Sequence, residues 1–133
     1  MEAGDFDAMA LRVARENARA NGLKGVRFAR MDVLKWKPER KWPVVLANVY
    51  GPILIQAAPQ IARAVERDGA LILSGILREQ ANDVIAAFCA QGITFERVAR
   101  KGKWVTALGR AASKRAGKTR GAKKPGRSGW KRA

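Results

Sequence analysis

Residues 44–51 read Val44-Val45-Leu46-Ala47-Asn48-Val49-Tyr50-Gly51, a short apolar run that ends on a polar amide, an aromatic ring and a glycine. Pro52 then opens a long segment in which apolar residues recur at helical spacing. This pattern predicts a strand, a sharp turn and a helix with proline in its first turn. In open α/β sheets, ligands bind just beyond the carboxyl ends of the strands. Asn48 occupies that position, so its side chain is a candidate for contact with a ligand.

Strands and helices alternate on both sides of this stretch. Upstream, the sequence predicts the end of a strand at residues 2–6, a helix at 8–21 with Asp7 as its N-cap, and a strand at 26–30. Residues 42–47 form the next strand, and their continuous apolarity predicts burial on both faces. Downstream, the sequence predicts a helix at 52–67, which Pro59 should kink or interrupt, and then a turn at 68–69. A strand at 70–76 and a helix from 78 or 79 to 91 follow, and the last two strands, at 93–100 and 103–108, are predicted to pair antiparallel. This order predicts an α/β fold with a mostly parallel sheet that closes on a C-terminal antiparallel hairpin.

The charge is distributed very unevenly along the 133 residues. Residues 113–133 hold nine Lys and Arg and no acid, a net charge of +9, whereas residues 1–112 carry only +7 of the total of +16. The tail also has almost nothing to bury, so it is predicted to be disordered. The sequence therefore predicts one domain at residues 1–112, followed by a basic tail at residues 113–133.

Composition excludes several classes of site. The chain has no His and a single Cys, so a metal site, an intramolecular disulfide and a hydrolase triad built on His are not expected. Cys89 falls on the apolar face of a predicted helix and is expected in the core. No apolar run approaches the roughly 18 to 20 residues that span a membrane, and the N-terminus lacks the features of a signal peptide. A cytoplasmic protein without a membrane partner is predicted.

Five stretches, in order and at consistent spacing, carry a resemblance to a known family. They are Gly4-Asp5-Phe6-Asp7; Glu16-Asn17-Ala18-Arg19-Ala20-Asn21-Gly22; Leu46-Ala47-Asn48-Val49-Tyr50 leading to Ala58-Pro59; Leu71-Ile72-Leu73-Ser74-Gly75-Ile76-Leu77; and Gly102-Lys103-Trp104-Val105. Together they resemble the C-terminal, catalytic part of PrmA-type methyltransferases. Those enzymes modify a ribosomal protein of the large-subunit stalk base and belong to the class I enzymes that depend on S-adenosylmethionine.

The resemblance implies a class I methyltransferase, Rossmann-like domain that is truncated at its N-terminus. The family's first strand and its glycine-rich loop, which hold the methionine part of the cofactor, should lie just upstream of Glu2. The family also usually has Pro where this sequence has Ala8. The basic tail lies outside the resemblance.

The resemblance also assigns residues to the cofactor, S-adenosylmethionine. Asp5, at the end of the strand before the first helix, is expected to accept hydrogen bonds from the ribose hydroxyls, and the alternative is a helix cap. Asp32 is expected to face the adenine amino group, with a backbone contact from Val33; the alternative is a solvated loop acid.

Asn48 is implied as the catalytic residue on the acceptor side. Its amide would accept a hydrogen bond from the target amine or hold the amino-acid end of the cofactor, while the alternative is a buried Asn that caps the next helix. Losing a hydrogen bond to a charged group would cost roughly 1.5 to 3 kcal/mol. Tyr50, Ser74 and Gly75 are candidates for the substrate side, although each could serve only packing or a turn.

The implied function is methyl transfer from S-adenosylmethionine to lysine or N-terminal amines of a large-subunit ribosomal protein. Two alternatives stay open. One is a catalytically inactive fragment or pseudoenzyme, because without the first strand two buried strand edges lack hydrogen-bond partners. The other is a basic protein that contacts RNA or the ribosome through residues 113–133. If the tail neutralised six phosphates, the logarithm of its RNA-binding constant would fall against the logarithm of the salt concentration with a slope of roughly −5.

Overall fold

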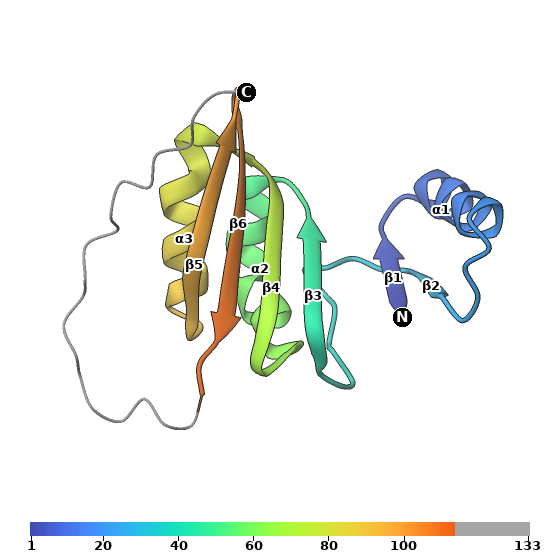
Figure 1. Cartoon of the computed structure of the whole chain (residues 1–133), viewed down its shortest axis with the longest axis horizontal. Coiled ribbons are helices and arrows are strands. Elements are labelled where there is room, and N and C mark those ends of the chain that lie inside the picture. Colours follow the sequence, from blue (N-terminus) through green and yellow to red (C-terminus); the bar gives the residue numbers. More distant parts are fainter. Residues whose placement is uncertain (114–133) are drawn as a thin grey trace.

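The computed structural model describes residues 1–113, so nearly all of the predicted basic tail lies outside the described residues. Helices and strands follow one another along the chain as shown in Figure 1. Their bounds are β1 Glu2–Asp5, α1 Ala8–Ala20, β2 Arg27–Arg30, β3 Trp42–Asn48, α2 Gly51–Arg63, β4 Val65–Leu77, the short 3-10 helix η1 Arg78–Gln80, α3 Ala81–Cys89, β5 Ile93–Lys101 and β6 Trp104–Ala111.

The first three elements form an N-terminal unit, β1-α1-β2. Strand β1 pairs in parallel with β2, and α1 packs on the pair. Helix α1 begins as predicted, because the Asp7 side chain accepts a hydrogen bond from the Met9 N–H at 2.8 Å. It ends as predicted at Asn21 and Gly22, and Gly22 takes a left-handed conformation with φ of 65°.

The remaining strands form a second sheet in the order β3-β4-β6-β5. Strands β3 and β4 run in parallel, whereas β6 is antiparallel to both of its neighbours, β4 and β5. Helices α2 and α3 cover one face of this sheet (Figure 1). The core lies between that face and the two helices, where Leu54, Leu71, Leu73, Val84 and Phe88 are fully buried. The predicted α/β class and the C-terminal antiparallel hairpin are confirmed.

The structure differs from three predicted details of the segment from α2 to α3. The predicted interruption at Pro59 is absent, because α2 continues through it to Arg63 with Ala57, Ala58 and Ile61 buried against the sheet. The helix ends at Arg63 rather than residue 67, since Val65 already pairs with Trp42 of β3. The predicted turn at 68–69 lies inside β4, where the register against β3 shifts.

The end of α3 brings a fourth correction. Cys89 is exposed rather than buried, because the buried face of α3 is formed by Ala81, Val84 and Phe88, and the next residue in a helix points about 100° away from Phe88. Gly92 follows with φ of 83° and ends the segment as predicted.

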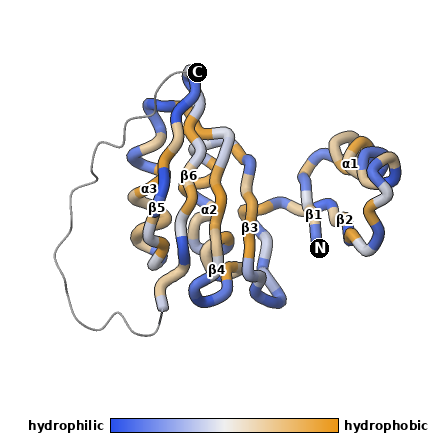
Figure 2. The backbone as a smooth tube through the Cα atoms, in the orientation of Figure 1, coloured by the Kyte–Doolittle hydropathy of each residue, from blue (hydrophilic) through white to orange (hydrophobic). Residues whose placement is uncertain are grey.

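Strand β3 is not buried on both faces, contrary to its apolar sequence. Ala47 is 9% exposed, but Val44 and Leu46 on the opposite face are 58% and 69% exposed. The physical reason is tertiary: β3 is an edge strand, and α2 and α3 cover only one face of the sheet. The hydropathy colouring shows β3 as an apolar strand at the margin of its sheet (Figure 2). An edge of this kind leaves backbone N–H and C=O groups without strand partners.

Candidate functional site

The sequence-predicted residues collect at the carboxyl ends of parallel strands. Asp5 ends β1 and pairs in register with Arg30 at the end of β2. Asn48 ends β3 and pairs in register with Ser74 of β4. Because parallel strands end at a common edge, each sheet presents its predicted residues on one side.

Asp5 is exposed at the end of β1. Its Oδ1 accepts a hydrogen bond from the Asp7 N–H at 2.8 Å, and its backbone carbonyl accepts one from the Met31 N–H at 2.9 Å. The side chain that caps α1 is therefore that of Asp7, not that of Asp5. Among residues 1–113, no side chain forms an ion pair with Asp5. The other carboxylate oxygen of Asp5, Oδ2, can accept hydrogen bonds from a ligand.

Asp32 follows β2 at the same edge and is partly buried. Its Oδ1 accepts a hydrogen bond from the Leu34 N–H at 3.0 Å, and Lys35 Nζ lies 4.0 Å from its Oδ2. These contacts hold the loop after β2 in a tight turn. Val33 is partly buried and packs against the core from this loop. The structure therefore brings Asp5, Asp32 and Val33 to one edge of the N-terminal unit.

Asn48, Ser74 and Gly75 form a second group on the larger sheet. Asn48 is exposed, not buried as its alternative role as a helix cap would have it. Its Oδ1 lies over Gly75, where a Cβ built on the glycine would be only 2.6 Å away. Gly75 has φ of 78°, a conformation that favours glycine. Gly75 thus leaves the space in which the Asn48 amide lies beside β4.

Tyr50 occupies the N-cap position of α2, but no side chain makes a capping hydrogen bond there. The alternative role of Asn48 as a helix cap is therefore not realised. The Tyr50 ring is 61% exposed and lies beyond the end of β3, on the way into the first turn of the helix. Its position leaves the ring available to a substrate rather than to the core.

Gln80 is a residue at this end of the larger sheet that sequence reasoning missed. Its Oε1 is buried without a hydrogen-bond partner among the described residues, and it packs against Gly51 in the first turn of α2. A buried amide oxygen without a partner is unusual. The only sequence signal is a polar residue shortly after the end of β4, which is weak.

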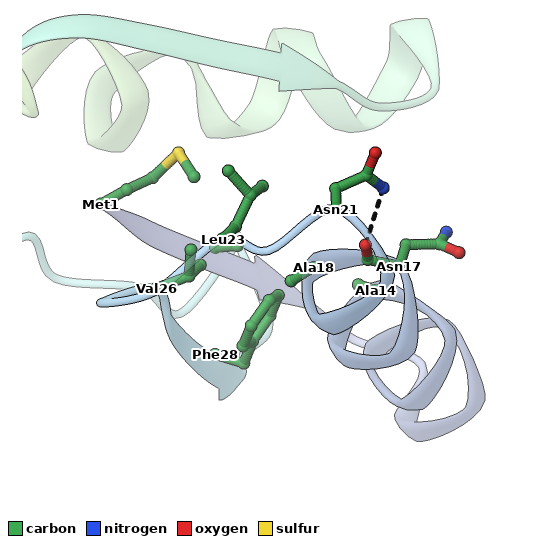
Figure 3. A pocket seen from close by; sticks show the side chains of 9 residues that line it. Met1, Ala14, Asn17, Ala18, Asn21, Leu23, Val26 and Phe28 are labelled. Atoms are coloured by element: carbon green, nitrogen blue, oxygen red, sulfur yellow. Dashed lines mark hydrogen bonds between the residues drawn. The ribbon is translucent and has the colours of Figure 1, made fainter.

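The two groups lie on separate sheets. No strand pairing within residues 1–113 joins β1 to β3. Two hollows on the described surface are lined by residues other than Asp5, Asp32 and Asn48. One, of about 320 Å³, lies between α1 and the start of the β1–β2 pair (Figure 3). The other, of about 540 Å³, lies between α2 and the loop that carries Trp36.

Two further features bear on the chemistry. Residues 1–113 contain no group of three or more His, Cys, Asp or Glu side chains placed to hold a metal ion. Within the same range, no helix combines the length and the apolar character needed to cross a membrane. The acceptor groups at the strand ends are thus carboxylates and an amide, which bind hydroxyl and amino groups by hydrogen bonds.

Comparisons with known proteins agree with this fold. Residues 1–112 match the family model described as ribosomal protein L11 methyltransferase (PrmA). A ribosomal protein L11 methyltransferase of Pseudomonas syringae pv. tomato is 35% identical over 106 residues, which are 80% of this chain and 36% of that protein. The chain thus spans about a third of the length of this curated relative.

Solved structures extend the comparison. The crystal structure of ribosomal protein L11 methylase from Lactobacillus delbrueckii subsp. bulgaricus superposes with a TM-score of 0.77 at 24% identity, over 84% of this chain and 57% of that one. A S-adenosylmethionine-dependent methyltransferase from Clostridium acetobutylicum has a TM-score of 0.69 at 11% identity, over 84% of this chain and 75% of that one. These likenesses show the same fold. The chain therefore belongs to the PrmA family of ribosomal protein L11 methyltransferases.

Proposed function

We propose that this chain supplies the nucleoside-binding and amine-binding strand ends of a S-adenosylmethionine-dependent methyltransferase that acts on amines of a large-subunit ribosomal protein. The observation that carries the proposal is the gathering of Asp5, Asp32 and Asn48 at the carboxyl ends of parallel strands, in a chain of the PrmA family. The name of the Pseudomonas syringae relative gives the substrate as ribosomal protein L11. We extend that substrate class, and a cytoplasmic location, to this chain.

The two carboxylates fit the nucleoside part of the cofactor. The Asp5 oxygen that is not bonded to the Asp7 N–H can accept hydrogen bonds from ribose hydroxyls. The Asp32 carboxylate and the backbone of Val33 would face the adenine amino group, which needs an acceptor. The roles of these two carboxylates are limited to the nucleoside part of the cofactor, and Asn48 is the candidate for its amino-acid end.

Asn48 would position the acceptor amine. Its Oδ1 can accept a hydrogen bond from the amine, but an amide is too weak a base to take the proton, which passes to solvent. The bound cofactor supplies an electrophilic methyl group on a positively charged sulfur. Asn48 would hold the nitrogen of the neutral amine toward that methyl group, and Asp5 and Asp32 would hold the nucleoside part of the cofactor. Alignment of the two partners is the main contribution of the protein.

Calorimetric titration of the chain with S-adenosylmethionine tests the proposal. Binding with a stoichiometry of one is expected, and S-adenosylhomocysteine should compete for the same site. A parallel assay follows transfer of labelled methyl groups to purified L11. Absence of heat at millimolar cofactor would refute cofactor binding by this chain.

A catalytically inactive fragment is the second candidate, and the unpaired edges of β1 and β3 favour it. The backbone N–H and C=O groups along these edges need partners, and without them the residues at the strand ends are held less firmly in place. The titration and the methyl-transfer assay together separate the two candidates, because cofactor binding without methyl transfer to L11 would assign the chain to this class.

Contact with RNA or the ribosome through residues 113–133 is a third candidate, favoured by their net charge of +9. If six of these charges meet phosphates, log affinity should fall against log salt with a slope of roughly −5. Removing residues 114–133 should then abolish most RNA binding and flatten this slope. An unchanged slope would exclude the tail as the contact.

A further inference from the structure

The hollow of about 540 Å³ lies between α2 and the loop that joins β2 to β3. Its volume falls in the range of about 300–1,000 Å³ that is usual for pockets that bind small molecules. Its lining includes neither the aspartates nor the asparagine that are proposed to hold the cofactor and the amine. The hollow is therefore a separate feature of the surface, and its own side chains indicate what it can bind.

The charged side chains around this hollow are all basic. Lys35, Lys37 and Arg63 line it, and none of its lining residues is acidic. Lys35 lies 4.0 Å from the Asp32 carboxylate, which partly neutralises it. Within residues 1–113, neither Lys37 nor Arg63 forms an ion pair, and both are exposed. Because Lys37 comes from the loop and Arg63 from α2, an anion in the hollow would meet a cation from each wall; phosphate is a common partner of both side chains.

Gln60 adds a hydrogen-bond acceptor that has no partner. Its Nε2 donates to the Leu34 carbonyl oxygen at 2.9 Å. Since a carbonyl oxygen only accepts, this contact fixes which end of the amide faces the loop. The other end, Oε1, is buried and has no hydrogen-bond partner among the described residues. A buried amide oxygen usually has one, and a ligand with an N–H or O–H group would supply it.

Trp36 gives the hollow an aromatic wall. The ring is partly buried, and its centroid lies 6.1 Å from that of Trp42, with an angle of 33° between the ring planes. Contact with Trp42 holds the Trp36 ring in place, so a flat ligand can pack against it with little further ordering of the side chain. Nucleic-acid bases stack on aromatic side chains in this way, whatever the base.

We propose that this hollow binds a nucleotide. The phosphate would lie between Lys37 and Arg63, the base would stack on Trp36, and an N–H or O–H group of the base or ribose would donate to Gln60 Oε1. Inorganic phosphate offers no ring for the tryptophan, and an uncharged nucleoside offers no anion for the two cations. A free nucleotide and a nucleotide of single-stranded RNA present the same chemistry. The proposal does not depend on methyl transfer.

Adenosine monophosphate (AMP) is the probe, titrated into the full chain while tryptophan fluorescence is followed. Saturable quenching is expected, because the base stacks on Trp36. Trp36→Phe should remove most of this quenching. Adenosine, which lacks the phosphate, should bind at least about five-fold more weakly than AMP. S-adenosylmethionine should not displace AMP, because the residues proposed to hold that cofactor do not line the hollow.

Substitutions that each remove one positive charge locate the contact. Lys37→Gln and Arg63→Gln should each weaken AMP binding at least about five-fold, because a charge-assisted contact is lost. Lys24→Gln is the matched control: Lys24 is exposed between α1 and β2, outside the lining of the hollow, and this variant should bind as the unmodified chain does. All three residues are exposed, and circular dichroism verifies that each variant folds. The basic tail is the same in every variant, so it contributes equally to each affinity.

A hexamer of adenylate RNA distinguishes the two sources of the nucleotide. If Lys37→Gln weakens binding of the hexamer by the same factor as binding of AMP, the hollow accepts a nucleotide within single-stranded RNA. If only AMP binding is weakened, the hollow accepts free nucleotides.

Four results would overturn the proposal. The first is no quenching at millimolar AMP, and the second is equal weakening by Lys37→Gln and Lys24→Gln, which would show attraction to net charge alone. The third is displacement of AMP by S-adenosylmethionine, which would assign the quenching to the cofactor site. The fourth is binding of adenosine or of inorganic phosphate as tight as that of AMP, because the hollow would then not recognise both parts of a nucleotide.

Discussion

Replacing Gly75 with alanine tests whether this glycine provides the space for the Asn48 side chain. Gly75 has φ of 78°, and left-handed backbone costs an L-residue about 1–2 kcal/mol. The new Cβ would also lie 2.6 Å from Asn48 Oδ1 and 3.1 Å from the Val49 carbonyl oxygen, so one of them must move. Overpacking costs about 1–3 kcal/mol in a closely packed site, and the lower end applies here because the exposed Asn48 amide can turn aside while the Val49 carbonyl cannot. The two effects together should lower the free energy of unfolding by about 2–3 kcal/mol.

Gly92→Ala is the matched control. Gly92 has φ of 83°, close to that of Gly75, but a Cβ at this position meets nothing within 4 Å. Its cost should be the backbone effect alone, about 1–2 kcal/mol. Urea unfolding followed by circular dichroism gives both values, provided that the denaturant dependence stays constant. The excess for Gly75→Ala, about 1 kcal/mol, then measures the contact with Asn48 and Val49.

The double variant Gly75→Ala with Asn48→Ala identifies the atom that is crowded. Asn48 is exposed, so removal of its amide alone should change stability by less than about 0.5 kcal/mol. In the double variant part of the excess should return, because the nearest atom, Oδ1, is gone. A role for Gly75 in making room for Asn48 is refuted if Gly75→Ala costs no more than Gly92→Ala, or if the two substitutions in the double variant are additive.

Three further predictions concern the strand ends. Asp7→Ala should destabilise the chain by about 1 kcal/mol through loss of the α1 cap, measured by urea unfolding, and it should leave cofactor affinity unchanged. Asp5→Ala should weaken S-adenosylmethionine binding by roughly 10-fold to 150-fold in calorimetry, because a hydrogen bond to a charged group is lost. If the variant binds with the same affinity as the unmodified chain, Asp5 does not hold the ribose. Asn48→Ala should slow methyl transfer to L11 by roughly 10-fold to 150-fold with little change in the affinity for S-adenosylmethionine. If only the affinity for S-adenosylmethionine falls, Asn48 contacts the cofactor rather than the acceptor amine.

Sequence reasoning succeeded where local chemistry decides the structure. The N-cap of α1 at Asp7 and the glycine stops at Gly22 and Gly92 are all realised. Each depends on a few neighbouring residues: an acceptor for a free N–H, or a residue that tolerates positive φ. The positions of Asp5 and Asn48 at strand ends follow from the same local pattern.

Most of the differences from prediction lie where distant segments decide. The end of α2 is set by pairing of Val65 with Trp42, 23 positions earlier in the sequence, which no local pattern shows. Pro59 remains inside the helix because neighbouring residues are buried against the sheet. Gln80 lacks any clear sequence signal, since its buried oxygen depends on how it packs against Gly51.

By itself, the sequence determined the alternation of strands and helices, their caps, and the polar residues that follow the strands. These depend on side-chain period and on local hydrogen bonds, which a single segment already contains. Only the tertiary structure decided which strands are neighbours and which faces are covered. It divides the strands into two sheets and leaves Val44 and Leu46 exposed on an open edge, although their sequence has the apolar character of a buried strand. Burial depends on what lies across a strand, and the sequence of the strand does not contain its neighbour.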